Sequence, residues 1–425
     1  MTKPIIANIH TYMKSKMDRK RKKIKKPHQN PPELDFVSPK LWKAFDQFLK
    51  VYKNVAILPF KFRLVERKVS RIPISKGKHF VQKLGPIFLV THTLICVVIL
   101  IQNVFRIPEE DEYSRENEIF RIAERFCLFY FITIISAFTQ FNYFVAWRPL
   151  CLCNIMNSIS PLHNRIKALG QINYKQTSNK LLELVVSTFV KYILFILPVI
   201  VPGFMWLHLD PMRTPLQILI NSENFIPNFF SIFLRATVLT LLWTELLKVV
   251  SGIFTLALIV MDGFTSGMRQ LRQVQRIRGT SPMRIMRLYS QLQLSNQYLN
   301  QTLCYYTIPP LIFFGVGLVT LTNYGTVRLH DVLPLSLYFI LPLTSFLGGV
   351  FVVVVLPLAS KVYETASDFI SFLRGRCISR YERRLFYSIK VIGIQSGPFH
   401  MLDKPSVVTI SKSVVDYTIH LLLTF

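Results

Sequence analysis

Residues 332–360 read VLPLSLYFILPLTSFLGGVFVVVVLPLAS, a run of 29 residues without a charged side chain. About 20 apolar residues in a helix are enough to cross the hydrocarbon core of a bilayer, and soluble domains rarely contain such runs. The rest of the chain agrees with this interpretation, because 51% of its 425 residues are hydrophobic. Its mean hydropathy is +0.36. The run therefore predicts a protein that crosses a membrane as helices.

Six other segments are long and apolar enough to cross a bilayer. Four of them contain no charge in their apolar part, whereas residues 229–261 include three charged residues and the last segment includes two. Glu245 and Lys248 are three residues apart, which predicts a structural ion pair on one helix face. We expect an all-α membrane protein with seven transmembrane helices, at about residues 85–105, 126–147, 185–209, 229–261, 303–327, 332–360 and 405–425.

The charges between these segments predict how the chain crosses the membrane. The loop at 106–125 has seven acidic and four basic residues, whereas the loop at 148–180 has five basic residues and no acidic one. Basic and non-basic loops continue to alternate, and cytosolic loops of membrane proteins are enriched in lysine and arginine. We therefore expect a cytosolic amino terminus and a carboxyl terminus outside. Because the basic residues lie between the spans, the net charge of +28 does not indicate nucleic-acid binding.

Residues 1–79 form a basic tail ahead of the first span, which we expect to lie in the cytosol. Within this tail, Ser38 followed by Pro39 is a typical helix start, and apolar residues recur at helical spacing after them. This pattern predicts an amphipathic helix at 38–60 that lies on the membrane or against the bundle. The basic run at 16–26 suits binding to anionic membrane lipid, although a solvated tail accounts for it equally well.

The remaining chain, residues 80–425, is expected to form one seven-span helical domain. Two of its segments outside the spans, 262–302 and 361–398, place apolar residues at helical spacing among arginines. Loops of a single molecule do not need so many ordered apolar positions, so these segments are predicted to form a cytosolic helical anchor. They pack on each other, on neighbouring subunits, or on both.

The sequence contains no motif that indicates an enzyme. It lacks a phosphate-binding loop, a dinucleotide fingerprint, a zinc-protease helix and a nucleophile elbow, and its nine histidines show no metal-ligand spacing. We therefore expect no catalytic residue, no metal and no cofactor. None of the six cysteines falls in a predicted outer loop, so no structural disulfide is expected either.

The last predicted span carries polar residues at steps of three or four, which places them on one face of a helix. These residues are Thr409, Ser413, Asp416, His420 and Thr424, with Lys412 and Tyr417 beside them. Such a stripe packs against polar partners inside the bundle or lines water. In a symmetric oligomer it would form rings around an axis, and a ring of carboxylates favours cations. The alternative is that Lys412 pairs with Asp416 and that His420 is buried in the bundle.

Three stretches of the sequence are similar to those of a known family: FLKVYKNVAILPF at 48–60, GPFHMLDKPSVVTI at 397–410 and LLLTF at 421–425. Together with seven spans, a cytosolic amino terminus and a chain that ends in its last span, they make the sequence resemble the insect gustatory and odorant receptor superfamily, in particular its gustatory branch. The family signature in the last helix is Thr-Tyr, five residues and Gln-Phe. Here Tyr417 and Thr418 stand in inverted order, and Thr424 takes the place of the glutamine.

The resemblance implies a function in taste or a related chemical sense. Members are tetrameric, ligand-gated, non-selective cation channels of the cell membrane, formed by identical or related subunits, and their last helix surrounds the pore. The pore-lining residues implied for this chain are Thr409, Ser413, Asp416, Tyr417, His420, Thr424 and Phe425. A small-molecule ligand such as a tastant is expected to bind in the outer half of the bundle. The residues placed there are Tyr130, Trp206, His208, Thr320, Asn323, Tyr324 and Tyr338.

Two other functions stay open at this point. A secondary transporter would show broken helices at matching positions of two halves, and proline and glycine interrupt two spans, at 197–203 and 307–317. Seven spans, however, do not divide into two equal halves. A non-conducting membrane receptor or assembly subunit agrees with the altered signature of the last helix.

Overall fold

The computed structural model describes residues 37–425 except 54–57, 65, 73–75, 106–114, 170–179, 207–208, 214–224, 332, 334, 378, 399 and 425. Residues 1–36 of the predicted tail, His208 and Phe425 therefore lie outside the described residues. Within the described part the fold is α-helical, as predicted, and seven helices are long and apolar enough to cross a membrane. The same part also contains two short β-hairpins, which the sequence did not predict.

The first four candidate spans follow the predicted segments. The first, second and fourth are α3 (Lys76–Phe105), α4 (Arg115–Trp147) and α9 (Phe225–Arg278). The third is a broken helix that consists of α6 (Lys180–Tyr192), η2 (Ile193–Ile196) and α7 (Leu197–Trp206). Helix α5 (Pro149–Ala168) lies between the second and third spans. Pro198 has no N–H to donate to the preceding turn, which explains why the third span is interrupted there. Helix α9 has 54 residues and so runs well beyond the predicted span.

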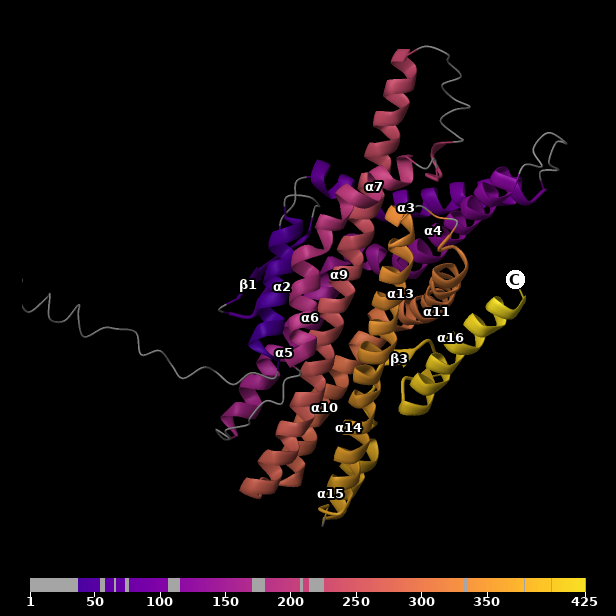
Figure 1. Cartoon of the computed structure of the whole chain (residues 1–425). Helices are drawn as coiled ribbons and strands as arrows, with labels where there is room; N and C mark the ends of the chain where they lie inside the picture. The colour runs from indigo at the N-terminus through magenta and orange to yellow at the C-terminus, as the bar shows by residue number, and fades with distance from the viewer. Residues whose placement is uncertain are drawn as a thin grey trace, which may run out of the picture. The chain divides into compact units, whose positions relative to one another are not determined.

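The last three candidate spans contain two π-helical turns. The fifth span is α10 (Pro282–Leu299), the π-helical turn η3 (Asn300–Cys304) and α11 (Tyr305–Arg328). The short helix α12 (Leu335–Tyr338) precedes the sixth, which is α13 (Ile340–Val350), the π-helical turn η4 (Phe351–Val355) and α14 (Leu356–Arg374). The seventh is α16 (Lys404–Thr424), which packs mainly on α11 and lies at one side of the bundle (Figure 1). Helix α11 also packs on α4 and α13, so it connects α16 to the other spans.

The amphipathic helix α2 spans Pro39–Tyr52, so the predicted end at residue 60 is too late. The chain instead continues to a hairpin of the antiparallel strands β1 (Phe60–Arg63) and β2 (Lys68–Arg71). Alternate side chains of β1 are buried, and Phe62 stacks on Trp42 of α2 with ring centroids 5.3 Å apart. Phe60, the last residue of the predicted helix, is thus the first residue of a strand.

Helix α2 packs against the bundle, which is one of the two predicted positions. The hydroxyl of its N-cap residue Ser38 donates to Glu183 of α6, and the Ser38 backbone N–H donates to Asp262 Oδ2 of α9 at 3.1 Å. Lys40 forms an ion pair with the same Glu183 at 3.3 Å. The buried face of the helix consists of Leu41, Trp42, Ala44, Phe45, Phe48 and Tyr52. Polar contacts therefore hold the start of α2, and apolar packing holds its length.

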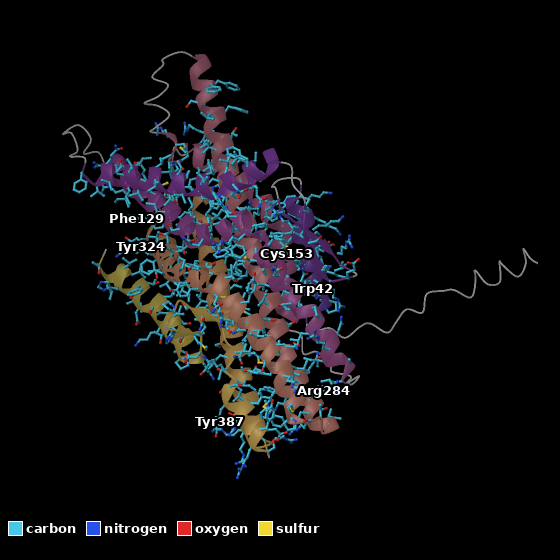
Figure 2. All side chains as sticks on the ribbon, turned by 180° about the vertical axis from the view of Figure 1, so that it is seen from behind. Trp42, Phe129, Cys153, Arg284, Tyr324 and Tyr387 are labelled. Atoms are coloured by element: carbon cyan, nitrogen blue, oxygen red, sulfur yellow. The ribbon has the colours of Figure 1, made fainter. Side chains whose placement is uncertain are left out.

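The two segments predicted as an anchor pack on each other. Tyr289 of α10 stacks on Phe369 of α14, with ring centroids 5.2 Å apart. The chain then forms α15 (Arg380–Ser388) and a hairpin of β3 (Gln395–Ser396) and β4 (His400–Met401), whose turn uses the positive φ of Gly397. We call the region formed by α10, the end of α14 and α15 the anchor end (Figure 1). Figure 2 shows Arg284 of α10 and Tyr387 of α15 in this region.

Candidate functional site

A cavity of about 110 Å³ lies within the bundle, where the second to the seventh candidate spans approach one another. Its wall is almost wholly apolar and includes Ile134, Phe138, Ile200, Leu246, Val316 and Leu343. An apolar cavity of about 150 Å³ in another protein holds benzene, so the volume here approaches that needed for a small organic ligand. A charged solute would lose its hydration in such a site without compensation. The cavity therefore suits a small, neutral, largely apolar molecule.

Three side chains give the cavity wall some hydrogen-bonding capacity. Tyr130 of α4 and Thr344 of α13 hydrogen-bond to each other, with their hydroxyl oxygens 3.0 Å apart. Trp243 of α9 is 3% exposed, and its indole N–H has no hydrogen-bond partner among the described residues. A buried donor without a partner costs free energy, so an acceptor oxygen on a ligand would gain from pairing with it.

The residues predicted to bind ligand do not gather at one site. Tyr130 lines the cavity. Trp206, the last residue of α7, is 85% exposed, and Thr320 is buried with a hydroxyl that has no partner in the described part of the chain. Tyr338 donates to a backbone carbonyl of α11 at 3.1 Å. Tyr324 is half-buried on α11, the helix between α4 and α16 (Figure 2). Of these five, Tyr130 alone belongs to the described cavity wall.

Sequence reasoning missed Trp243 and Thr344. Each lies in an apolar run, where one aromatic or hydroxyl side chain forms no pattern of its own. A signal was available for Trp243, because tryptophan in membrane proteins is enriched near the interfaces and this one lies in the middle of a predicted span. No comparable signal marks Thr344.

Asn323, another residue of the predicted ligand set, lies where three helices meet. Its side-chain N–H on α11 donates to Thr418 Oγ1 of α16 at 3.4 Å. Its side-chain carbonyl accepts a hydrogen bond from the hydroxyl of Ser345 on α13. Ser345 directly follows the cavity residue Thr344. The amide side chain of Asn323 therefore connects α13, which contributes Thr344 to the cavity wall, to α16.

Helix α16 presents most of its polar stripe away from its own bundle. Val407 and Val414 are buried against the other helices. The exposed polar residues are Thr409, Asp416, Tyr417, His420 and Thr424, with Ser413 half-buried beside them. The alternative ion pair between Lys412 and Asp416 does not form in the described part of the chain, and His420 is not packed inside the bundle. The stripe is therefore available to line water or to meet another subunit.

Polar contacts hold both ends of α16. At its start, Asp403 accepts hydrogen bonds from the backbone N–H of Ser406, at 2.9 Å, and from the Ser406 hydroxyl. These bonds, together with the nearby His400, hold the pKa of the Asp403 carboxyl below its usual value. At its end, Arg328 Nη2 of α11 donates to the Leu422 carbonyl at 3.0 Å, where the helix dipole also favours a cation.

The charged residues within the predicted span of α9 are paired. Glu245 and Lys248 form the predicted ion pair, and Asn142 of α4 donates to Glu245 at 3.3 Å. Arg235 pairs with Asp210, which follows α7. Paired charges of this kind indicate a structural role. The described residues contain no group of three or more histidine, cysteine, aspartate or glutamate side chains that could hold a metal ion.

No protein-family model and no curated protein matches the sequence. Solved structures do match the fold. The insect olfactory receptor OR5 from Machilis hrabei in complex with eugenol is similar with a TM-score of 0.53 and 12% sequence identity, over 91% of this chain and 99% of that chain. A second structure of the same receptor matches over the same shares, with a TM-score of 0.53 and 14% identity. The chain therefore has the fold of an insect olfactory receptor, as the resemblance implied.

Proposed function

We propose that this chain, which shares the fold of an insect olfactory receptor, is a subunit of a chemosensory, ligand-gated and non-selective cation channel. The observation that carries the proposal is the exposed polar face of α16. A carboxylate such as Asp416 on a lipid-length helix is costly when it faces hydrocarbon. That cost disappears when the same face lines water at the centre of an oligomer.

In a symmetric oligomer, one α16 from each subunit surrounds a common axis. The pore-lining residues we propose are Thr409, Ser413, Asp416, Tyr417, His420, Thr424 and Phe425. Their polar side chains form rings, and a ring of Asp416 carboxylates favours cations over anions. The resemblance to the receptor superfamily supports an assembly of four subunits, either identical or related.

The gating ligand we propose is a small neutral molecule that carries an acceptor oxygen and binds in the cavity. Tyr130 and Thr344 exchange hydrogen bonds with it, and Trp243 donates one. The solved receptor of the same fold holds eugenol, a mostly apolar phenol, which supports a ligand of this class. Such a ligand opens the channel when it binds the open arrangement of the helices better than the closed one. The further ligand residues Trp206, His208, Thr320, Tyr324 and Tyr338 stay predictions.

The setting we propose is the plasma membrane, with the amino terminus and the anchor end in the cytosol. The alternation of basic and non-basic loops supports this orientation. In this orientation the basic tail meets the inner leaflet, where anionic lipid attracts lysine and arginine.

Recording membrane current from cells that express the full chain tests the proposal. A panel of small neutral tastants and odorants, with eugenol among them, is expected to contain at least one agonist that evokes a cation current. The mass of the purified complex is expected to correspond to four chains. Surface-expressed chain without current, alone and with related subunits, would support a non-conducting receptor instead. Uptake of a solute without channel current would support a transporter, and either result contradicts the proposal.

A further inference from the structure

A chain of polar side chains leads from the cavity to α16. Tyr130 and Thr344 hydrogen-bond in the cavity wall, with their oxygens 3.0 Å apart. The next residue of α13, Ser345, donates to the amide oxygen of Asn323, and the amide nitrogen of Asn323 donates to Thr418 Oγ1 at 3.4 Å. Both ends of the Asn323 amide are therefore bound to neighbouring helices, which is an argument against a direct contact between Asn323 and a ligand.

Other hydroxyl groups of α16 make no such contact. The hydroxyls of Thr409, Ser411 and Ser413 each donate to a carbonyl one turn earlier in the same helix. Thr418 donates to its own helix in the same way, at 2.7 Å, and its oxygen also accepts from Asn323. Along residues 407–424, the described structure contains no other side-chain to side-chain hydrogen bond between α16 and another helix. The Asn323–Thr418 contact therefore differs in kind from the packing around it.

We propose that Asn323 is a positioning residue that couples occupancy of the cavity to the position of α16. This inference rests on the proposed function and adds to it the side chain that transmits the signal. A ligand that pairs with Tyr130 or Thr344 competes with the hydrogen bond between them, and it shifts α13 at Thr344. The adjacent Ser345 then moves the carbonyl end of Asn323, and the other end of the same amide moves Thr418.

Helix α16 also reaches the cavity directly, at a point separate from its contact with Asn323, and the two contacts together give it a way to tilt. Ile410 belongs to the cavity wall. It lies about 12 Å from Thr418 along the helix axis, which is roughly two turns. The contact at Ile410 is apolar and responds to the volume of an occupant, whereas the contact at Thr418 is directional. When one of these two contacts moves relative to the other, the helix tilts, and Asp416 and His420, within one turn of Thr418, move with it.

The test uses a tethered occupant, which does not require that the ligand be known. Leu347 lies in the cavity wall on α13, so Leu347→Cys places a thiol there. Cys151→Ala and Cys377→Ala remove the two half-buried native thiols. The Cys thiolate attacks propyl methanethiosulfonate at its sulfenyl sulfur, methanesulfinate leaves, and a mixed disulfide holds a propyl group in the cavity. The mass of the intact chain confirms the modification.

Two quantities are then measured before and after modification: the cation current, and the hydrogen exchange of the backbone amides of α16. Asn323→Leu and Thr418→Val remove the contact with little change in side-chain volume. Each is expected to reduce the effect of the propyl group by about fivefold to tenfold, the equilibrium effect of one ordinary hydrogen bond. The double variant is expected to lose no more than either single variant, because both act on one contact.

Thr326→Val is the matched control. Thr326 lies one turn after Asn323 on α11, and its hydroxyl donates to its own helix at 2.6 Å. This variant is expected to keep the full effect of the propyl group on both measured quantities. A loss as large as that of Thr418→Val would overturn the proposal, since it would show that any hydroxyl in the region matters equally.

The two measurements separate this inference from the channel proposal. If modification changes the current equally in wild type, Asn323→Leu and Thr418→Val, the channel proposal stands and the coupling role of Asn323 is wrong. If modification changes the exchange of α16 through Asn323 but no variant carries current, the coupling stands and the channel proposal is wrong. Independent, additive losses in the double variant would also overturn the coupling.

Discussion

The guanidinium of Arg235 on α9 holds one carboxylate oxygen of Asp210 with two of its nitrogens, Nε at 2.9 Å and Nη2. The two side chains are 8% and 2% exposed. The second carboxylate oxygen of Asp210 accepts the backbone N–H of Met212 at 3.1 Å. This ion pair ties the chain that follows α7 to α9, and both charged groups are largely buried.

Removal of one partner is expected to destabilise the protein strongly. Asp210→Ala leaves the Arg235 charge buried and unpaired, which typically costs about 3–5 kcal/mol in free energy of unfolding. The double variant Asp210→Leu with Arg235→Met is expected to lose much less, because no uncompensated charge remains. Thermal unfolding of the purified protein in detergent measures both. Equal losses in the single and double variants would show that the pair acts through its shape alone.

Neutralising Asp416 is expected to change which ions pass, with little effect on folding, because the side chain is exposed on α16. The electrostatic attraction of one charge for a cation in a water-filled pore is about 1 kcal/mol, which corresponds to about fivefold in an equilibrium constant. Because every copy of the variant loses this charge, Asp416→Asn should lower the permeability of sodium relative to chloride by at least this factor. Asp416→Glu is the control and should retain the wild-type ratio. Reversal potentials in asymmetric salt give the result, and an unchanged ratio in Asp416→Asn would remove this residue from the pore.

Filling the cavity is expected to reduce the response to agonist. Gly315 lines the cavity, and a Cβ added there meets no atom within 4 Å, so Gly315→Leu occupies free space. Gly349 has equally free space but does not belong to the cavity wall, which makes Gly349→Leu the matched control. Agonist concentration–response curves should shift to higher concentration in Gly315→Leu and not in Gly349→Leu. Identical curves would place the ligand elsewhere.

Two adjacent glycines on α13 are expected to respond in opposite ways to alanine. A Cβ on Gly348 would lie 2.2 Å from a methyl group of Val319, whereas a Cβ on Gly349 meets nothing within 4 Å. Gly348→Ala should therefore cost about 1–3 kcal/mol through overpacking. Gly349→Ala should stabilise the helix by up to about 1 kcal/mol. Adding Val319→Ala to Gly348→Ala should recover part of the loss, and thermal unfolding that ranks the two glycine variants the other way contradicts the close contact.

Acid is expected to loosen the start of α16. The pKa of Asp403 is lower in the folded chain than its ordinary value, because Ser406 donates two hydrogen bonds to the carboxylate. Its contribution to stability is therefore present above the unfolded pKa of about 3.9 and is lost as pH falls through the lower folded value. Asp403→Asn keeps an acceptor but cannot titrate, so its unfolding temperature should fall less than that of wild type over this acidic range. Equal losses would contradict the assignment.

Properties set by neighbouring residues could be predicted from the sequence. The charge-free run at 332–360 predicted a span because the length of an apolar run and the thickness of a bilayer decide the matter without any partner. The pair Glu245 and Lys248 forms as expected, because their separation of three residues places them on one helix face. The polar face of α16 follows in the same way from the spacing between Thr409 and Thr424.

Properties set by distant residues could not be predicted. The cavity wall combines residues from six candidate spans, so no local pattern marks Trp243 or Thr344. Asn323 was expected near a ligand, but its partners Ser345 and Thr418 lie 22 and 95 residues away along the chain. The spacing of residues along α11 shows which face of the helix carries Asn323. It does not show which other helix packs against that face. Only the packing of α11 against α13 and α16 reveals its contacts.

The π-helical turns η3 and η4 each contain one residue more than an α-turn would need. Each residue of a helix turns the chain by about 100°, so the faces before and after such a turn are offset in phase by that amount. This offset lets α13 present Thr344 to the cavity while α14 presents Phe369 to α10. A deletion of one residue within η4 would leave both helices intact but remove the offset. The cavity and the anchor end therefore depend on the length of the chain at this point as well as on the side chains that form them.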